Sequence, residues 1–158
     1  MHTSQKGSTC SPERSSRPRW PPQGSPPYPP PRMRQPPRTP PERVCGKGFH
    51  RVKDGHRAMK TKRGAVFGHV YLMYSKRSGK NCVAAIKTAF TGTRTTTGAY
   101  LEVKGGGRSE DEQRYRYYAE TGHIQGAWKC VRYAGWTRDP DNRVTAFGGR
   151  KSWGNCKG

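Results

Sequence analysis

From position 44 onward, apolar residues fall into short runs in which every second residue would share a face. In the run VFGHVYLMY, an extended backbone places Val70, Leu72 and Tyr74 on one side. Tyr71 and Met73 lie on the other side, so both faces of this segment are expected to be partly covered. The pattern predicts a β-strand over residues 66–74.

Further strands are predicted where short runs rich in β-branched and aromatic residues end near glycine. Residues 75–80 are turn-forming and would join two strands in a hairpin, and the glycine run 105–107 is expected to be a turn. Only 109–118 could form a helical turn, since no window has convincing helical periodicity. We therefore expect an all-β, mostly antiparallel sandwich or barrel. The other predicted strands are 49–53, 81–88, 99–103 and 128–133.

Proline divides the chain into two regions, because 13 of its 14 prolines precede residue 42. Proline fixes φ and removes an amide donor, so residues 1–43 are expected to form a disordered arm that leans toward polyproline II. Pairs such as Pro40-Pro41 are expected to exclude helix and sheet alike. Docking of residues 21–31 on an aromatic groove is the alternative to a simple linker. Residues 44–158 then form one β domain.

The chain is strongly basic, with 31 Lys and Arg residues against 10 Asp and Glu and a formal charge of +21. Only 30% of its residues are hydrophobic, which suffices for one modest core and argues against a multidomain enzyme. Residues 44–158 hold 23 basic and 8 acidic residues, so this domain should attract polyanions such as nucleic acid or teichoic acid. The residues proposed to bind them are Lys53, Arg57, Lys60, Lys62, Arg63, Lys76, Arg77 and Lys80.

Aromatic residues are interleaved with basic residues later in the chain, as base stacking and phosphate neutralisation together would require. No RRM, KH or helix-turn-helix signature accompanies them, so binding to nucleic acid is expected to be independent of sequence. The aromatic residues concerned are Tyr115, Tyr117, Tyr118, Trp128, Tyr133 and Trp136, and the basic ones Arg108, Arg114 and Arg116.

Five cysteines stand at positions 10, 45, 82, 130 and 156. No C-x-x-C pair is present, which argues against a zinc ribbon. Four widely spaced cysteines in a domain with a small core predict two disulfides and an oxidising compartment, and four buried thiols in a cytosolic protein are the alternative. Three pairings are possible. We favour Cys45 with Cys82 and Cys130 with Cys156, only because each joins neighbours in sequence, and we expect Cys10 to stay outside them.

Several motifs of the domain occur in the order and spacing of one known family. They are VCGKGF, GHVYLMY, KNCV, GAYLEV, YYA, KCV and the closing GNCKG. Together they resemble the spore-associated protein A family of filamentous actinobacteria, over essentially all of residues 44–158. The resemblance implies a small exported protein at the spore or cell surface, with no established enzymatic activity, cofactor or catalytic residue.

Three features depart from the pattern of that family. Residues 1–43 contain no apolar stretch of the kind that a secretory signal requires, and a wrongly assigned start codon would reconcile this with export. The domain is more basic than expected, and VRYAGW follows Cys130 where an aromatic and two glycines are expected. No apolar run of about 18 residues predicts a membrane-spanning helix. We expect an extracellular or spore-surface protein that is a monomer.

A small secreted ribonuclease is the enzymatic alternative, because such enzymes can act with a carboxylate base, a histidine acid and a cationic phosphate clamp. The competing interpretation is that the carboxylate faces solvent beside Tyr100 in a half-buried strand. No phosphate loop, nucleophile elbow or zinc-protease motif is present. The residues that could supply the three roles are Glu102, His69 or His123, and Arg94 or Arg108.

A metal site would need at least three ligands. Cys45, His50 and His56 have a loosely ligand-like spacing, but Cys45 is expected to be in a disulfide and no third ligand is evident. The sequence therefore predicts a non-enzymatic secreted or spore-surface protein without metal or cofactor. A polyanion-binding module is the second hypothesis and the ribonuclease is the third.

Overall fold

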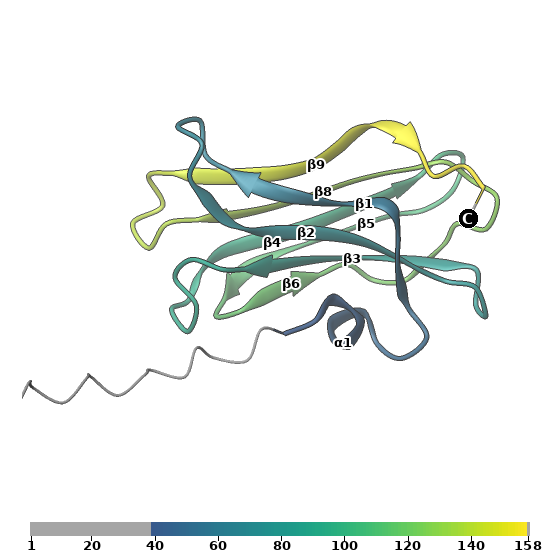
Figure 1. The fold of residues 1–158 in the computed structure, drawn as a ribbon, viewed down its shortest axis with the longest axis horizontal. Coiled ribbons are helices and arrows are strands. Elements are labelled where there is room, and N and C mark those ends of the chain that lie inside the picture. The colour runs from purple at the N-terminus through teal and green to yellow at the C-terminus, as the bar shows by residue number, and fades with distance from the viewer. Residues whose placement is uncertain (1–38, 158) are drawn as a thin grey trace, which may run out of the picture. The chain divides into compact units, whose positions relative to one another are not determined.

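The structure is a computed structural model that describes residues 39–157, so most of the predicted arm, including Cys10 and residues 21–31, lies outside the described part. Within residues 39–157 the chain forms one short helix and nine strands (Figure 1). The helix α1 spans Pro41–Cys45. The strands are β1 (His50–Lys60), β2 (Val66–Ser75), β3 (Lys80–Lys87), β4 (Thr95–Val103), β5 (Arg108–Tyr115), β6 (Tyr118–Glu120), β7 (Ile124–Gln125), β8 (Val131–Arg138) and β9 (Thr145–Gly154).

All strand pairs are antiparallel and belong to one curled sheet with the order β5-β4-β8-β9-β1-β2-β3-β6, while β7 also pairs with β3. The segment after β6 returns to β5, where the amide of Gly122 donates to Ser109 Oγ at 2.9 Å. The result is a nearly closed barrel (Figure 1). The predicted all-β antiparallel class is therefore confirmed.

The barrel interior is filled by side chains at alternate strand positions, as the hydrophobic pattern predicted. Leu72 and Val70 of β2 face Leu101 of β4 and Tyr133 of β8, and all four side chains are almost fully buried. Small residues such as Ala85 and Ala99 complete this core and let the strands approach closely. The remaining fully or nearly buried members are Met59, Val83, Val103, Ala119, Val131 and Ala146.

A second, smaller core lies on the outer side of β2 and β3, beneath α1. There Val44 and Phe49 pack against Met73 and Ile86. The helix begins at Pro41, so the expectation that Pro40-Pro41 would exclude helix is wrong. A proline at the first helical position needs no amide donor, and its fixed φ already suits a helix.

Two disulfides hold the ends of the domain to the barrel. Cys45, at the end of α1, is bonded to Cys82 in β3, and Cys130, before β8, is bonded to Cys156 after β9. The pairing favoured from sequence is thus the one in the structure. The first bridge fixes α1 over the second core, and the second bridge ties the C-terminal segment to the start of β8.

Two local expectations from the sequence are corrected by the structure. Residues 109–118, the only stretch that could form a helical turn, lie mostly in β5, whose side chains are exposed or half-buried. The predicted strand 128–133 begins only at Val131, because Trp128 is in a turn with φ of 61° and is 81% exposed. Both segments are extended because β5 and β8 pair with β4. This partner lies elsewhere in the chain, so the sequence of each segment alone does not reveal the pairing.

None of the helices among residues 39–157 is long and apolar enough to cross a membrane.

Candidate functional site

A cleft of about 690 Å³ opens beside the C-terminal segment. Three parts of the chain form it: the start of β1, the end of β2 with its following turn, and the segment after β9. We call it the cationic cleft. The residues that line it are His50, Arg51, Val52, Lys53, Tyr74, Lys76, Asn155, Cys156 and Lys157.

A bulge in β1 produces this opening. Regular pairing with β2 stops at Arg51 and resumes at His56, so β1 bends between these two residues. At the bend Asp54 has a φ of 62°, and a Cβ added to Gly55 would lie 2.8 Å from the carbonyl oxygen of Leu72. Because β1 pairs with β9 only at Lys60 and Phe147, the first half of β1 stands apart from β9.

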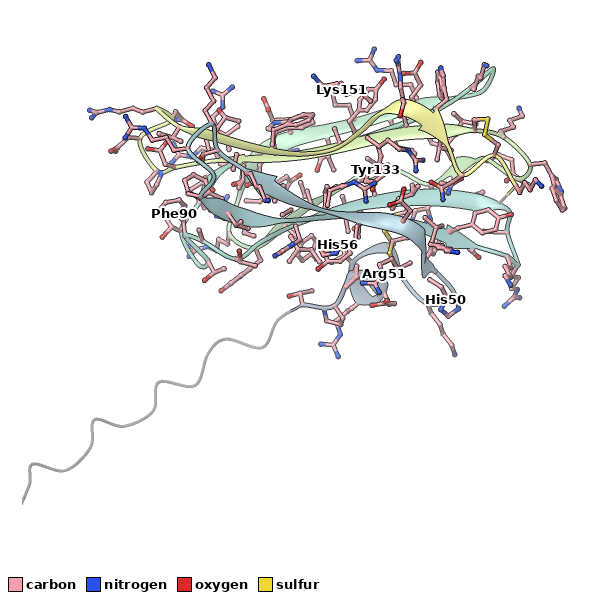
Figure 2. The ribbon with its side chains drawn as sticks, turned by 45° about the horizontal axis from the view of Figure 1, so that its top comes forward. His50, Arg51, His56, Phe90, Tyr133 and Lys151 are labelled. Atoms are coloured by element: carbon pink, nitrogen blue, oxygen red, sulfur yellow. A yellow bond between two sulfur atoms is a disulfide. The ribbon has the colours of Figure 1, made fainter. Side chains whose placement is uncertain are left out.

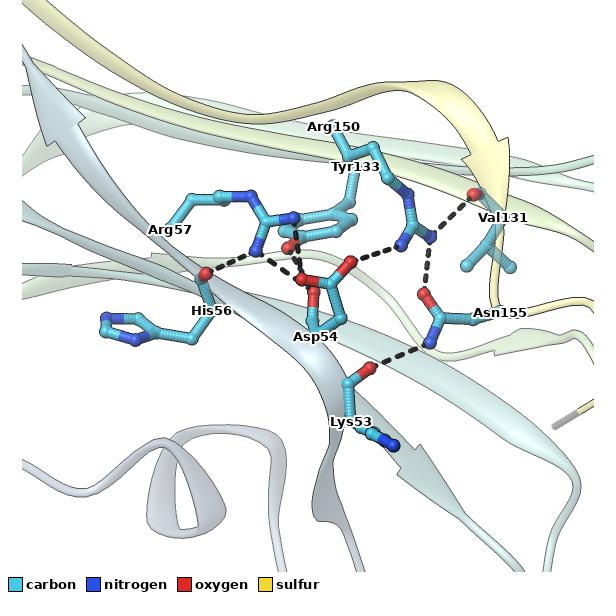
Figure 3. Close-up of polar contacts among 8 residues, drawn as sticks. All are labelled: Lys53, Asp54, His56, Arg57, Val131, Tyr133, Arg150 and Asn155. Carbon is cyan, nitrogen blue, oxygen red and sulfur yellow. Dashed lines mark hydrogen bonds and ion pairs between the residues drawn. The ribbon is translucent and has the colours of Figure 1, made fainter.

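A network of charged side chains joins β1 to the C-terminal segment across this gap (Figure 3). Asp54 lies 2.8 Å from Arg57 and 3.5 Å from Arg150, measured between carboxylate oxygens and guanidinium nitrogens. The hydrogen bond from Arg57, and then the charges of Arg57 and Arg150, hold the pKa of Asp54 below its usual value. The carboxylate is therefore ionised and neutralised by two arginines at neutral pH.

Arg150 and Asn155 continue this network to the wall of the cleft (Figure 3). The Arg150 guanidinium donates to the carbonyl of Val131 at 3.2 Å and to the side-chain oxygen of Asn155. Asn155 in turn donates to the carbonyl of Lys53 at 3.1 Å. Together with the adjacent Cys130–Cys156 bridge, these bonds hold the C-terminal segment against β1. The cleft is thus preformed by covalent and ionic links.

The cleft carries a concentrated positive charge. Arg51, Lys53, Lys76 and Lys157 are all exposed, and none of its lining residues described by the structure is acidic. His50 lies beside them and is paired with Tyr74 across β1 and β2. Like charges gathered in one concave site raise the local potential and attract anions.

The eight basic residues predicted to bind polyanions do not form one surface. Lys53 and Lys76 line the cleft. Arg57 instead forms an ion pair with Asp54, and its guanidinium donates to the carbonyl of His56 at 2.7 Å. Arg77 lies in the same turn as Lys76, and Lys80 begins β3 directly after that turn. Lys60, Lys62 and Arg63 lie at the opposite end of the β1–β2 hairpin; β2 spans ten residues, so the two ends are about 30 Å apart.

Sequence reasoning missed two cations of the cleft, Arg51 and Lys157, and it considered His50 only as a metal ligand. Arg51 lies within the predicted strand 49–53, but Lys157, which lines the same cleft, is more than a hundred positions away. Only the disulfide between Cys130 and Cys156, if used as a distance restraint, could have pointed to the C-terminal lysine.

Of the residues proposed for a ribonuclease, the structure brings together Glu102 and Arg108, which are cross-strand partners in β4 and β5. Arg94 lies just before β4, whereas His69 is in β2 and His123 follows β6. In the described chain Glu102 is bonded to Tyr100 and Arg132, and these hydrogen bonds lower the pKa of Glu102. His69 is 2.9 Å from His56, and His123 lies 3.8 Å from Glu120. The carboxylate is thus bound to a tyrosine and an arginine within the sheet, which agrees with the interpretation of Glu102 as the strand partner of Tyr100.

The metal candidates are distributed in a similar way. His50 lines the cleft, His56 stacks on Tyr71, and Cys45 is buried in its disulfide. A different trio, Cys82 with Glu120 and His123, has its ligand atoms within 4.8 Å of one another. Because the Cys82 sulfur is bonded to Cys45, it offers no thiolate to a metal ion in this state.

Among curated proteins, the chain is similar to spore-associated protein A of Streptomyces coelicolor. The two are 34% identical over 93 residues, which are 58% of this chain and 55% of that protein. The resemblance inferred from the sequence motifs is confirmed by this match. The chain spans about half the length of the curated relative that it matches. No protein-family model matches the chain, and no solved structure matches it.

Proposed function

We propose that this protein is a non-enzymatic, spore- or cell-surface-associated protein that binds anionic, phosphate-rich polymers through the cationic cleft. The observation that carries the binding proposal is the gathering of Arg51, Lys53, Lys76 and Lys157 around one preformed concave site. The similarity to a spore-associated protein and the two disulfides support a location outside the reducing cytoplasm.

The shape and chemistry of the cleft favour a polymer of repeating phosphates over a single compact anion. The four cations project from three separate parts of the chain around an open cleft of about 690 Å³. A flexible chain with regularly spaced phosphates can contact several of them at once, and each contact releases condensed counterions. A teichoic-acid-type polyol phosphate fits this description, and recognition would depend on charge spacing rather than on base sequence.

Two triple variants of the full chain test the proposal. The first, R51A/K53A/K76A, removes three cations from the cleft, and the second, K60A/K62A/R63A, removes three from the opposite end of the hairpin. We expect R51A/K53A/K76A to weaken the binding of polyglycerol phosphate at least about tenfold. The variant K60A/K62A/R63A should change this affinity little. The measurement is isothermal titration calorimetry at low salt. Equal losses in both variants would show that net charge alone drives binding.

The non-enzymatic part of the proposal has a separate test. The full chain is incubated with labelled RNA and EDTA between acidic and neutral pH, alongside the variants H69A, E102A and H123A. We expect intact RNA in every sample, since Glu102 is bonded to Tyr100 and Arg132. Cleavage that depends on either histidine would refute the assignment.

A further inference from the structure

The outer face of β4, β8 and β9 carries a second concave site, on the opposite side of the sheet from the core. In Figure 2 Lys151 projects outward from β9, whereas Tyr133 of β8 lies on the inner side. A groove of about 340 Å³ runs over this outer face. Its outward-facing lining includes Tyr100, Glu110, Arg132, Trp136, Phe147 and Lys151, and it is also bordered by Arg150, which belongs to the Asp54 network as well.

The register of the strands explains why a groove forms here. Tyr100 of β4 pairs with Ala134 of β8, and Ala134 pairs with Gly149 of β9. In this row across the sheet, only Tyr100 has a large side chain. A Cβ added to Gly149 would lie 2.7 Å from the Cα of Ala134. The φ of Gly149 is 143°, which also favours glycine at this position. Ala134 lines the groove, and its partner Gly149 adds no side chain that would fill it.

Aromatic rings form one wall. In the neighbouring row Trp136 pairs with Gly98 on one side and with Phe147 on the other. A Cβ on Gly98 would collide with the indole, so the Trp136 ring lies over the glycine. Phe147 is 42% exposed, although a side chain of this size is usually buried. We call this site the aromatic trough.

Polar groups of both signs surround these rings. Trp136 donates its indole N–H to Glu112, and Arg132 is held by Glu102 at 2.6 Å. The Lys151 ammonium lies 5.5 Å from the centre of the Phe147 ring. Most of these charges are paired within the sheet, so the trough presents aromatic faces and hydrogen-bonding groups with little net charge. In this it differs from the cationic cleft.

We propose that the aromatic trough binds an uncharged glycan chain, whose pyranose rings stack on Trp136 and Phe147. Aromatic faces are electron-rich and attract the C–H groups of a sugar face, while carboxylates and guanidinium groups bond its hydroxyls. Trp136 and Phe147 are direct cross-strand neighbours about 5 Å apart, a spacing on the scale of one sugar ring. Glu110 and Arg132 supply hydroxyl partners at the rim.

The same chemistry disfavours a phosphate polymer in this site. The carboxylate of Glu112 lies in the row of Trp136 and would repel phosphates, and Glu110 is paired with Arg108 at 2.9 Å. The Arg132 guanidinium is already neutralised by Glu102. The trough therefore provides a second binding function whose ligand differs from that of the cationic cleft.

The test measures binding of chitohexaose and cellohexaose to the full chain by calorimetry and tryptophan fluorescence. F147A is matched by F90A, since Phe90 is 37% exposed but lies in the turn after β3. We expect F147A to weaken glycan binding about tenfold and F90A to leave it unchanged. A134L fills the trough without removing a ring and should also abolish binding, while thermal unfolding confirms that each variant is folded.

Two further arms separate a glycan from other ligands. Polyphosphate should not compete with chitohexaose, and raising salt to about 0.5 M should leave glycan binding within twofold, because no net charge is neutralised. Absence of binding by both hexasaccharides would overturn the proposal. So would equal losses in F147A and F90A, unchanged binding in folded A134L, or displacement of chitohexaose by polyphosphate.

Discussion

The cationic cleft and the aromatic trough belong to one barrel but are assembled by different forces. The cleft depends on segments far apart in sequence, which Asp54, Arg150, Asn155 and the Cys130–Cys156 bridge hold together. The trough depends on the hydrogen-bonded register of β4, β8 and β9. A site made from loops and termini can open locally when one of its contacts is removed. A site within a sheet is lost only when the strands of the sheet separate.

The largest effect should come from the bridge beside the cleft. The double variant C130S/C156S opens a loop whose ends are 26 positions apart, and we expect it to lower the free energy of unfolding by about 3 kcal/mol. Because Cys156 and Lys157 line the cleft, binding of polyglycerol phosphate should weaken as well, while chitohexaose binding persists. Denaturant titration and calorimetry measure these effects. Loss of both ligands in a folded variant would contradict the independence of the two sites.

Salt should separate the two sites by a comparable amount. If a polymer neutralises the four cations of the cleft, a fourfold rise in salt should weaken its binding about a hundredfold. Glycan binding in the trough should hardly change, since its charges are paired internally. Parallel titrations of both ligands at salt concentrations from about 50 to about 200 mM provide the comparison. Similar salt slopes for the two ligands would argue that both bind through the cleft.

The ion pairs of Asp54 should contribute less, and in a pH-dependent way. The pKa of Asp54 is lower in the folded state than its usual value of 3.8, so its stabilising effect is present above that value. It is lost as the pH falls through the lowered pKa. We expect D54N to reduce Tm by about 2 °C at neutral pH, and this difference to vanish under strongly acidic conditions. A constant difference between wild type and D54N at every pH would rule out the ionic explanation.

The smallest effect should come from removing residues 1–38. Every residue of the two described cores and of both sites lies beyond position 43, so a chain starting at Thr39 should keep its Tm within error. Chitohexaose binding should also be unchanged. Thermal unfolding of both chains provides the measurement, and a drop of several degrees would show that the arm contributes to folding.

Much of the fold was predictable because it depends on local patterns. The alternation in VFGHVYLMY identified β2, and turn residues at 75–80 located its hairpin with β3. The strand β9 was missed because AFGGRKSWG combines three glycines with charges and has little alternation. The strand β5 was missed because most of its side chains are polar and exposed, so it shows no hydrophobic alternation. Pairing partners, and not intrinsic preference, make these two segments extended.

Aromatic residues illustrate the same limit. The interleaving of Tyr133 and Trp136 with basic residues indicated a stacking surface on the sequence alone. In the structure Tyr133 is buried in the core, and Trp136, three positions later, lies on the outer face. Residues an odd number of positions apart on a strand point to opposite faces of the sheet. Composition alone therefore cannot tell a core ring from a surface ring until the register of the strand is known.

The sequence by itself determined the strand-rich class, the four bridging cysteines, the excess of positive charge and the likeness to a spore-associated protein. These properties depend on residue type and short-range spacing. Tertiary structure alone decided that Arg51, Lys53, Lys76 and Lys157 share one cleft while Lys60, Lys62 and Arg63 lie at the far end. It also placed Trp136 and Phe147 side by side in neighbouring strands. Such neighbours are set by strand order and register, which arise from contacts between segments distant in the chain.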